Sequence, residues 1–256
     1  MNQLVILGTG IMFLTRLPVG KYASGDSHAL VQAVRFFPLI GVIVALIMGC
    51  VLMLSNLLLP LSVSVVLALF AGVMATGAFH EDGLADLADS AGAFEVSRKL
   101  DIMRDSRVGT YGSLALVLCL ALRFALIFEL ATYGTSVVLA ALILAHSSGR
   151  WSSAFLMANV DYARSEAGNK VVAQGVNNTI LLQSTLCLLL VMLVPAVVIS
   201  LWIYAALAVV WLVSIASAHY FRSTFNGITG DCLGAANVIT ELMSMMFVLA
   251  CLRLFA

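Results

Sequence analysis

Charged residues are scarce in this 256-residue chain. Lysine, arginine, aspartate and glutamate make up 10% of it and hydrophobic residues 62%, whereas a soluble domain carries roughly 25% charged residues. The 13 basic and 13 acidic residues cancel, so no basic field predicts binding to nucleic acid. The five cysteines have no CxxC spacing, which argues against a zinc site or a disulfide framework. No Walker loop is present either, which excludes a soluble nucleotide domain of that type.

Long apolar runs dominate the chain instead. A membrane-spanning helix needs ~20 apolar residues. The ranges near that length are 37–59, 62–79, 111–131, 135–157, 178–199, 201–221 and 233–252. Segment 3–15 is shorter and is interpreted as re-entrant, interfacial or a short span. We therefore predict an all-α, polytopic integral membrane helix bundle with about seven transmembrane helices plus a short N-terminal apolar helix, forming one domain over residues 1–256.

Basic residues alternate between the predicted connections. Lysine or arginine occurs in loops 16–36, 80–110, 158–177 (Arg164 and Lys170) and 222–232. The turns near residues 60, 133 and 200 carry none. Because basic loops stay on the cytoplasmic side of a membrane, this alternation predicts that the charged loops, with the acids they contain, face the cytoplasm.

The densest acidic segment follows directly on the predicted span 62–79. Seven of the 13 acids lie in residues 81–105. On a helix, Asp82, Asp86 and Asp89 would project within an arc of about 60°. Carboxylates this close repel one another unless a cation lies between them, and oxygen ligands suit Mg²⁺, Mn²⁺ or Ca²⁺. We interpret them as a divalent-metal site at the membrane surface, with Gly83 leaving room for a ligand. The simpler alternative is a solvated loop.

A second charged segment, residues 100–112, ends in a glycine-flanked turn before another apolar run. Free N–H groups at a helix start bind phosphate, and arginine adds bidentate donors. One interpretation is an anion clamp, and the other is a surface helix with internal ion pairs. The residues alone favour neither. The candidates for the clamp are Arg104, Asp105, Ser106, Arg107 and Gly109.

A third polar segment places Asp231 at the start of the last apolar run. Capping that helix is the simplest role for its carboxylate. Residues 230–235, Gly-Asp-Cys-Leu-Gly-Ala, also echo Glu-Asp-Gly-Leu-Ala-Asp at 81–86. The echo is weak evidence for a pseudo-repeat of two halves that meet at one site. On that interpretation the catalytic loops are 80–110 and 222–235.

Some charged residues fall inside predicted spans. Arg123 is spaced to pair with Glu129, and Arg150 is spaced to contact His146 one turn earlier. Arg150 lies toward the cytoplasmic end of its span and could reach a phosphate. An interior histidine such as His146 is more often a hydrogen-bonded structural residue, whereas His80, beside the carboxylates, is the better candidate for acid–base chemistry.

Five stretches resemble the cobalamin synthase family, the adenosylcobinamide-GDP ribazoletransferases, along nearly the whole chain. They are Phe13-Leu-Thr-Arg-Leu-Pro-Val19, Phe37-Pro-Leu-Ile-Gly41, Phe79-His-Glu-Asp-Gly-Leu-Ala-Asp-Leu-Ala-Asp89, Ile102-Met-Arg-Asp-Ser-Arg-Val-Gly-Thr-Tyr-Gly112 and Thr229-Gly-Asp-Cys-Leu-Gly-Ala235. The chain departs from the family pattern at Glu81, where an apolar residue is usual, at Ser90, where glycine is frequent, and near Val238, where the family often has an acid.

The resemblance implies a multi-pass transferase of the bacterial inner (cytoplasmic) membrane in vitamin B12 assembly. Such an enzyme joins GDP-activated adenosylcobinamide to α-ribazole or its 5′-phosphate and releases GMP, with Mg²⁺ required. The implied partners are these two small molecules and the lipid bilayer, with no nucleic acid, and a homo-oligomer stays open.

The resemblance also implies roles for the candidate residues. Asp82, Asp86 and Asp89 are expected to hold Mg²⁺ on the diphosphate, and Asp231 to complete that site. The expected phosphate contacts are Arg104, Arg107 or Arg150. A carboxylate or His80 is expected to accept the proton of the attacking 5′-hydroxyl group.

Other classes are weighed against this one. A cation-coupled transporter also carries intramembrane acids at a repeat boundary, but it would place them near mid-span. A CDP-alcohol phosphotransferase would need Asp-x-x-Asp-Gly-x-x-Ala-Arg, which residues 79–90 do not supply. A purely structural membrane subunit would give the acidic stripe no purpose.

Overall fold

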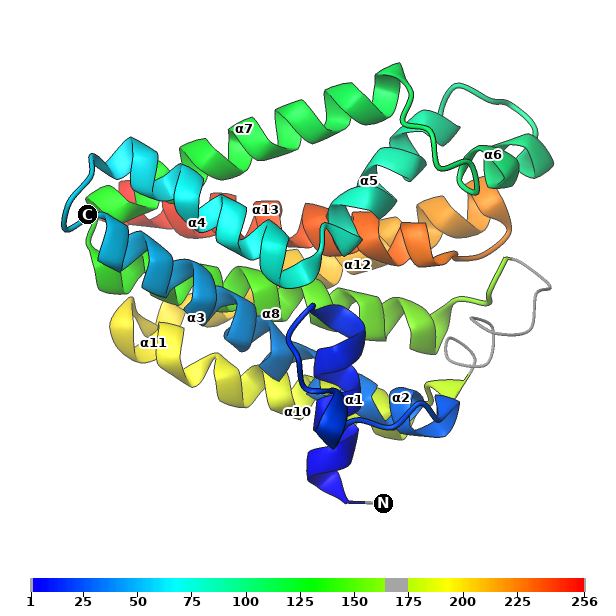
Figure 1. The fold of residues 1–256 in the computed structure, drawn as a ribbon, viewed down its shortest axis with the longest axis horizontal. Helices are drawn as coiled ribbons and strands as arrows, with labels where there is room; N and C mark the ends of the chain where they lie inside the picture. The colour runs from blue at the N-terminus through cyan, green and yellow to red at the C-terminus, as the bar shows by residue number, and fades with distance from the viewer. Residues whose placement is uncertain (1, 164–174, 256) are drawn as a thin grey trace.

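The computed structural model describes residues 2–163 and 175–255, and that part of the chain is helical apart from connections and one isolated β-bridge. Its α-helices are α1 (Gln3–Leu14), α2 (Ser27–Ala33), α3 (Phe37–Ser55), α4 (Leu61–Thr76), α5 (Phe79–Ser90), α6 (Val96–Ile102), α7 (Thr110–Thr132), α8 (Thr135–Asn159), α10 (Asn178–Val191), α11 (Leu193–Val198), α12 (Ala206–Phe225) and α13 (Gly230–Phe255). The predicted all-α class is confirmed, and Figure 1 shows the long helices packed side by side as a bundle.

Within the described residues, five helical segments are long and apolar enough to cross a membrane, or six if the bent pair α4–α5 counts as one span. The five are Ser27–Ser55, Thr110–Thr132, Asn178–Val198, Leu201–Phe225 and Gly230–Leu254. The sequence predicted about seven. The chain is therefore a multi-pass membrane protein, with fewer spans that meet these criteria than expected.

Helix α8 accounts for part of the difference. It is a long helix, as predicted, but every residue from 140 to 154 is buried inside the protein. It packs against α3 on one side and α13 on the other. Its second half carries His146, Arg150 and several serines, which lower its hydropathy. Residues 140–154 of α8 are therefore surrounded by other helices of the bundle and not by lipid.

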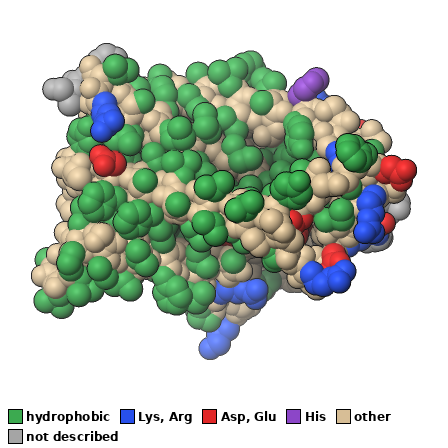
Figure 2. Space-filling view, turned by 90° about the horizontal axis from the view of Figure 1, so that it is seen from above, with side chains coloured by type: hydrophobic (Ala, Val, Ile, Leu, Met, Phe, Trp, Pro, Cys, Tyr) green, Lys and Arg blue, Asp and Glu red, His purple; other side chains and the backbone are tan. Residues whose placement is uncertain are grey.

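The outer surface is apolar. Long stretches of α4, α7, α10 and α12 expose large apolar side chains. In Figure 2 hydrophobic side chains are spread over the whole face, and the charged ones lie mainly toward its edges. A soluble protein rarely exposes so large an apolar area, but lipid is a suitable solvent for it. The exposed leucines therefore mark the faces that contact the bilayer.

The polar connections gather at one end of the bundle. Helix α6 and the first turn of α13 lie there, whereas the α3–α4 connection and the C-terminus lie at the opposite end (Figure 1). This separation agrees with the predicted alternation of basic and uncharged connections. Two residues used in that argument, Arg164 and Lys170, fall outside the described residues.

A sharp break separates α4 from α5. Gly77 and Ala78 both adopt left-handed backbone conformations, with φ of 68° and 58°, and the two helices meet at 89°. Glycine takes this conformation readily, whereas alanine is strained in it. The backbone N–H of Arg16 donates to the carbonyl oxygen of Ala75, with an N···O distance of 2.7 Å, and so ties the end of α4 to the segment after α1. The predicted span 62–79 thus ends at Thr76, and α5 crosses toward α13.

The contact between α3 and α8 depends on Gly41. A Cβ atom at this position would lie 2.4 Å from the backbone oxygen of His146, closer than atoms can approach. Glycine therefore lets the two helices touch through their backbones, as small residues do in membrane helix packing. This contact fixes the position of His146 and Arg150 along the axis of the bundle.

We expect Gly41→Ala to lower the thermal stability of the detergent-purified protein, because the added methyl group must separate α3 from α8 and overpacking costs roughly 1–3 kcal/mol. Gly49→Ala is the matched control, because its Cβ would meet only the flexible end of Leu139. The measurement is the temperature at which half of the monodisperse protein is lost on heating. Equal shifts for the two variants would contradict the close backbone contact.

Candidate functional site

A cavity of about 260 Å³ lies where α5 meets the start of α13. Four of the residues singled out in the sequence line it: His80, Asp82, Arg150 and Asp231. Asp82 is exposed and Asp231 half-buried, whereas His80 and Arg150 are buried. The remaining lining residues are Phe13, Leu14, Leu30, Phe37, Phe79, Ser153, Met157, Tyr162, Gly230, Leu233, Gly234 and Asn237. The cavity thus has an acidic mouth, a mostly apolar wall and a polar floor.

Two glycines bring the acidic segments of α5 and α13 together. A Cβ at Gly83 would lie 2.8 Å from the backbone oxygen of Asp231, and one at Gly234 would lie 3.2 Å from that of His80. The sequence interpretation of Gly83 as room for a ligand is therefore wrong, because the backbone of α13 occupies that space. The same contact brings the segments that begin at residues 80 and 230 to one cavity; whether they form a repeat stays a prediction.

Asp231 is in the first turn of α13. The sequence predicted that Asp231 caps this helix, but Thr229 caps it instead. The Thr229 hydroxyl oxygen accepts from the Cys232 N–H at 3.3 Å and lies 3.2 Å from Asp231 Oδ2. A carboxylate in the first turn also interacts favourably with the helix dipole. Asp231 itself is among the residues that line the cavity, at its acidic mouth.

The three aspartates of α5 do not share one environment. Asp82 lines the cavity, and Asp86 is half-buried and outside its lining. Asp89 Oδ2 accepts from the Gly109 N–H at 2.7 Å, and its Oδ1 accepts from the Gly112 N–H at 2.8 Å. Asp89 therefore holds the start of α7, where its carboxylate occupies the N–H groups that the sequence assigned to phosphate.

Among the described residues, no group of three or more His, Cys, Asp or Glu side chains is arranged to hold a metal ion. A single cage built from Asp82, Asp86 and Asp89 is thus not what the structure forms. Mg²⁺, however, is usually held by one or two carboxylates together with waters and substrate phosphates. Asp82 and Asp231 supply two carboxylates at one cavity mouth, and this donor set fits such an ion.

The predicted anion clamp of residues 104–109 lies outside the cavity lining. Arg104, Ser106 and Gly109 are exposed. The Arg107 Nε donates to Asp105 Oδ1 at 2.9 Å. Hydrogen bonds from the Arg107 side chain and backbone lower the pKa of Asp105 to about 2. This is an ion pair, as in the simpler interpretation, but it lies in the connection after α6 and not within a helix. It uses the Nε and Nη2 of Arg107, and Nη1 remains for another acceptor.

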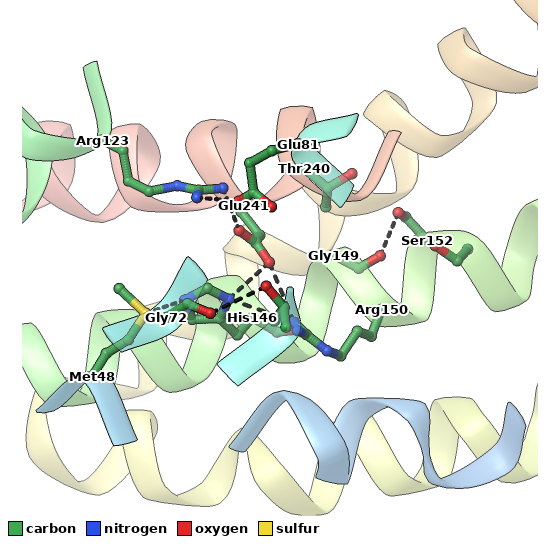
Figure 3. Close-up of polar contacts among 12 residues, drawn as sticks. Met48, Gly72, Glu81, Arg123, His146, Gly149, Arg150, Ser152, Thr240 and Glu241 are labelled. Carbon is green, nitrogen blue, oxygen red and sulfur yellow. Dashed lines mark hydrogen bonds and ion pairs between the residues drawn. The ribbon is translucent and has the colours of Figure 1, made fainter. Parts of the chain in front are cut away.

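A network of buried charges supports the cavity floor (Figure 3). Arg123 on α7 donates to Glu81 Oε1 at 2.7 Å and to Glu241 Oε2 at 2.8 Å. The other oxygen of Glu241 lies 2.7 Å from His146 Nδ1 and 3.3 Å from Arg150 Nη1. Two glutamates thus balance two arginines within the bundle, and the network reaches the cavity through Arg150.

Sequence reasoning anticipated only part of this network. The expected contact between His146 and Arg150 is confirmed, because Arg150 Nη1 donates to the His146 carbonyl oxygen at 2.9 Å. The expected pairing of Arg123 with Glu129 is wrong, since both Nη groups of Arg123 bond to acids on other helices. Helical spacing within one span cannot reveal partners on α5 and α13.

Three residues at the floor and in the network were missed as functional candidates. Glu241 and Glu81 could have been found by requiring every charge in an apolar span to have a partner. Asn237 is fully buried and lines the cavity. The signal for Asn237 was a lone amide six residues after Asp231 in an otherwise apolar stretch.

We expect Arg123→Met to destabilise the protein strongly, because removing one partner of a buried charge network costs roughly 3–5 kcal/mol. Glu129→Gln, on the same helix, should change stability little. Thermal unfolding of both variants in the same detergent is the measurement. A larger effect of Glu129→Gln would restore the pairing predicted from spacing.

We expect Asp89→Ala to loosen the first turn of α7, because two backbone N–H groups lose their acceptor at a cost of about 1–2 kcal/mol. Hydrogen–deuterium exchange of residues 109–113 should become faster in this variant. Asp101→Ala, at an exposed position of α6, should leave that exchange unchanged. Unaltered exchange in Asp89→Ala would show that its carboxylate does not hold α7.

Comparison with known proteins gives the family. The model of the cobalamin-5-phosphate synthase family matches residues 7–250. Proteins named adenosylcobinamide-GDP ribazoletransferase are similar throughout: that of Shewanella frigidimarina is 38% identical over 98% of this chain and 96% of its own length, and that of Shewanella amazonensis is 40% identical over 97% and 96%. No solved structure matches. The chain belongs to the cobalamin-5-phosphate synthase family.

Proposed function

We propose that this protein joins adenosylcobinamide-GDP to α-ribazole, or to its 5′-phosphate, and releases GMP. Its relatives are named adenosylcobinamide-GDP ribazoletransferase, a name that supports the donor and the ribazole group of this reaction. The observation that carries the proposal is that Asp82 and Asp231, from two distant segments, meet at one cavity with His80 and Arg150. Carboxylates that can bind a metal ion, a positive charge for phosphate oxygens and a group that can accept a proton are suited to transfer at a diphosphate.

The reaction exchanges one phosphorus–oxygen bond for another. An acceptor hydroxyl oxygen attacks the phosphorus that carries the cobinamide, and the bond from that phosphorus to the bridging oxygen of GMP breaks. The hydroxyl proton passes to a base, and GMP leaves with the bond electrons. The resemblance implied attack by the 5′-hydroxyl, but an acceptor that carries a 5′-phosphate has no free 5′-hydroxyl. The nucleophile common to both forms of the acceptor is therefore a secondary ribose hydroxyl.

Asp82 and Asp231 are the residues proposed to hold Mg²⁺, which neutralises charge on the diphosphate oxygens when it is bound. Asp86, one turn along α5 from Asp82, stays a candidate for the same site. Both oxygens of Asp89 already accept N–H groups at the start of α7, so Asp89 is the weaker candidate for this site. Acidic residues from α5 and α13 would thus orient the diphosphate at the mouth.

The buried residues have the remaining proposed roles. His80 lies on the cavity wall beside Asp82 and is one candidate for the base; a carboxylate at the mouth is the other. Arg150 is held by Glu241 and the His146 backbone, so it would offer a fixed positive charge to phosphate oxygens. Arg104 and Arg107, in the exposed loop, would be recruited only on substrate binding.

We also propose that the cavity opens to the cytoplasm at the inner membrane of a bacterium. The basic connections support this, since positively charged loops stay inside. A transporter is disfavoured by the same geometry. The acids line a cavity at one end of the bundle, whereas coupled transport is expected to use a site near the membrane midplane.

The test is release of GMP by purified protein supplied with adenosylcobinamide-GDP, α-ribazole and Mg²⁺. We expect Asp82→Asn and Asp231→Asn each to lower the rate at least about 100-fold, because metal stabilisation of phosphate charge is worth several kcal/mol. Asp101→Asn, which removes an exposed acid of α6, should be as active as wild type.

Two outcomes would contradict the proposal. If the wild type released no GMP, the proposed reaction would be refuted. If it instead carried cations across proteoliposome membranes without transferring ribazole, a transporter would be favoured. Full activity in both Asp82→Asn and Asp231→Asn would instead remove the assigned site while leaving the reaction in place.

A further inference from the structure

Helix α1 exposes apolar side chains on the face that turns away from the bundle. Its inner face packs against α2 and α3, whereas Leu4, Met12 and Phe13 are exposed. A helix that is apolar on both faces is stable in a protein core or in lipid, and the 12 residues of α1 are too few to span a bilayer. The outer face of α1 therefore needs an apolar surrounding that does not require the helix to cross the membrane.

The direction of α1 fits a position in the plane of the membrane. In Figure 1 it runs across α8 and the other long helices. Its end is joined to the end of α4, because the backbone N–H of Arg16 donates to the carbonyl oxygen of Ala75. The rings of Phe13 and Phe79 also meet, with their centroids 5.5 Å apart. Because the long helices cross the bilayer, α1 lies roughly parallel to its surface, level with the break between α4 and α5.

The break between α4 and α5 marks the place where the lipid-facing surface ends. Phe70 and Met74, one turn apart near the end of α4, are exposed on a helix whose outer face contacts the bilayer. After the break Phe79 is exposed as well, and Asp82, one turn further along α5, is an exposed acid. The change from lipid to water thus falls between Met74 and Asp82, which is the level of the lipid headgroups.

Phe13 and Phe79 belong to the cavity as well as to this surface. Both line the cavity and are 43% and 45% exposed, so they form an apolar lip of its mouth beside Asp82. The connection that follows α1 carries exposed Arg16 and Lys21. Aromatic side chains are enriched at the interface between membrane and water, and anionic headgroups attract basic residues beside it. The lip therefore has the side chains that suit the edge of a bilayer.

We propose that α1 is an interfacial helix, embedded at the boundary between the headgroups and the acyl chains, and that the lipid covers the apolar lip formed by Phe13 and Phe79. The inference rests on the proposed function only for the side of the membrane, the cytoplasmic one. The bilayer then forms one wall of the site. Water-soluble substrates and products must pass the acidic side of the mouth, where Asp82 and Asp231 lie.

The first test uses the wild-type protein in nanodiscs that contain a phospholipid with a photoactivatable diazirine close to its glycerol group. After illumination and proteolysis, mass spectrometry locates the lipid adducts along the chain. We expect adducts on residues 11–14 and 77–80. Residues 104–107, in the exposed connection after α6, are the control and should carry few. Equal labelling of the control and of residues 11–14 would overturn the proposal.

The second test measures access of water to the same surface. Phe13→Cys and Ser106→Cys each place a thiol at an exposed position, and wild type gives the background from the native cysteines. In nanodiscs a water-soluble maleimide should modify Phe13→Cys at least about tenfold more slowly than Ser106→Cys, because an apolar surrounding suppresses the reactive thiolate. Met12→Cys, exposed on α1 but outside the cavity lining, should react as slowly as Phe13→Cys. Rates equal to that of Ser106→Cys would contradict a lipid-covered lip.

A second copy of this chain is the other occupant that an apolar face could take. The continuity of the lip with the exposed residues of α4 favours lipid. Oxidative cross-linking of Met12→Cys into dimers, without lipid adducts on residues 11–14, would make the second copy the occupant and overturn the proposal. Neither test uses a substrate. A protein that passes both but releases no GMP would refute the proposed reaction alone, and an active protein that fails both would refute only the interfacial position of α1.

Discussion

The pairing of buried charges inside the bundle is the constraint on which the site depends. Arg123 and Arg150 cannot lie in a low-dielectric interior without partners, and Glu241 contacts both. Because Arg123 also binds Glu81 on α5, one set of ion pairs connects α5, α7, α8 and α13. The helices that carry the candidate site are thus fixed relative to one another by charge as well as by packing.

The break between α4 and α5 turns this constraint into a cavity. If α4 had continued straight, the acidic segment would have left the bundle. The left-handed residues Gly77 and Ala78 redirect the chain by 89°, and Gly83 then allows α5 to lie directly on α13. The Ala78 N–H donates to the carbonyl oxygen of Val73 at 3.2 Å, and Arg123 holds Glu81 three residues after the break. The break in the backbone and the buried ion pairs thus lie within one turn of each other on α5.

The sequence predicted what depends on local pattern. Apolar runs gave the helices, and the polar segments at 80–89 and 226–235 gave His80, Asp82 and Asp231, which the structure places at one cavity. The errors concern what depends on distant contacts. Equal spacing on one helix face did not keep Asp82 and Asp89 together, because the N–H groups of Gly109 and Gly112 offered Asp89 two hydrogen bonds. Likewise Arg123 found its acids on other helices.

The short helix α1 shows how length alone decides a role. Its 12 residues extend about 18 Å, which is well short of the ~30 Å apolar core of a bilayer. A helix of that length cannot span, and it packs instead against α2 and α3. Phe13 lies near the end of α1, and the centroid of its ring is 5.5 Å from that of Phe79. Both residues line the cavity. This short segment therefore forms part of the cavity wall. Its partner in the aromatic contact, Phe79, is the first residue after the break between α4 and α5.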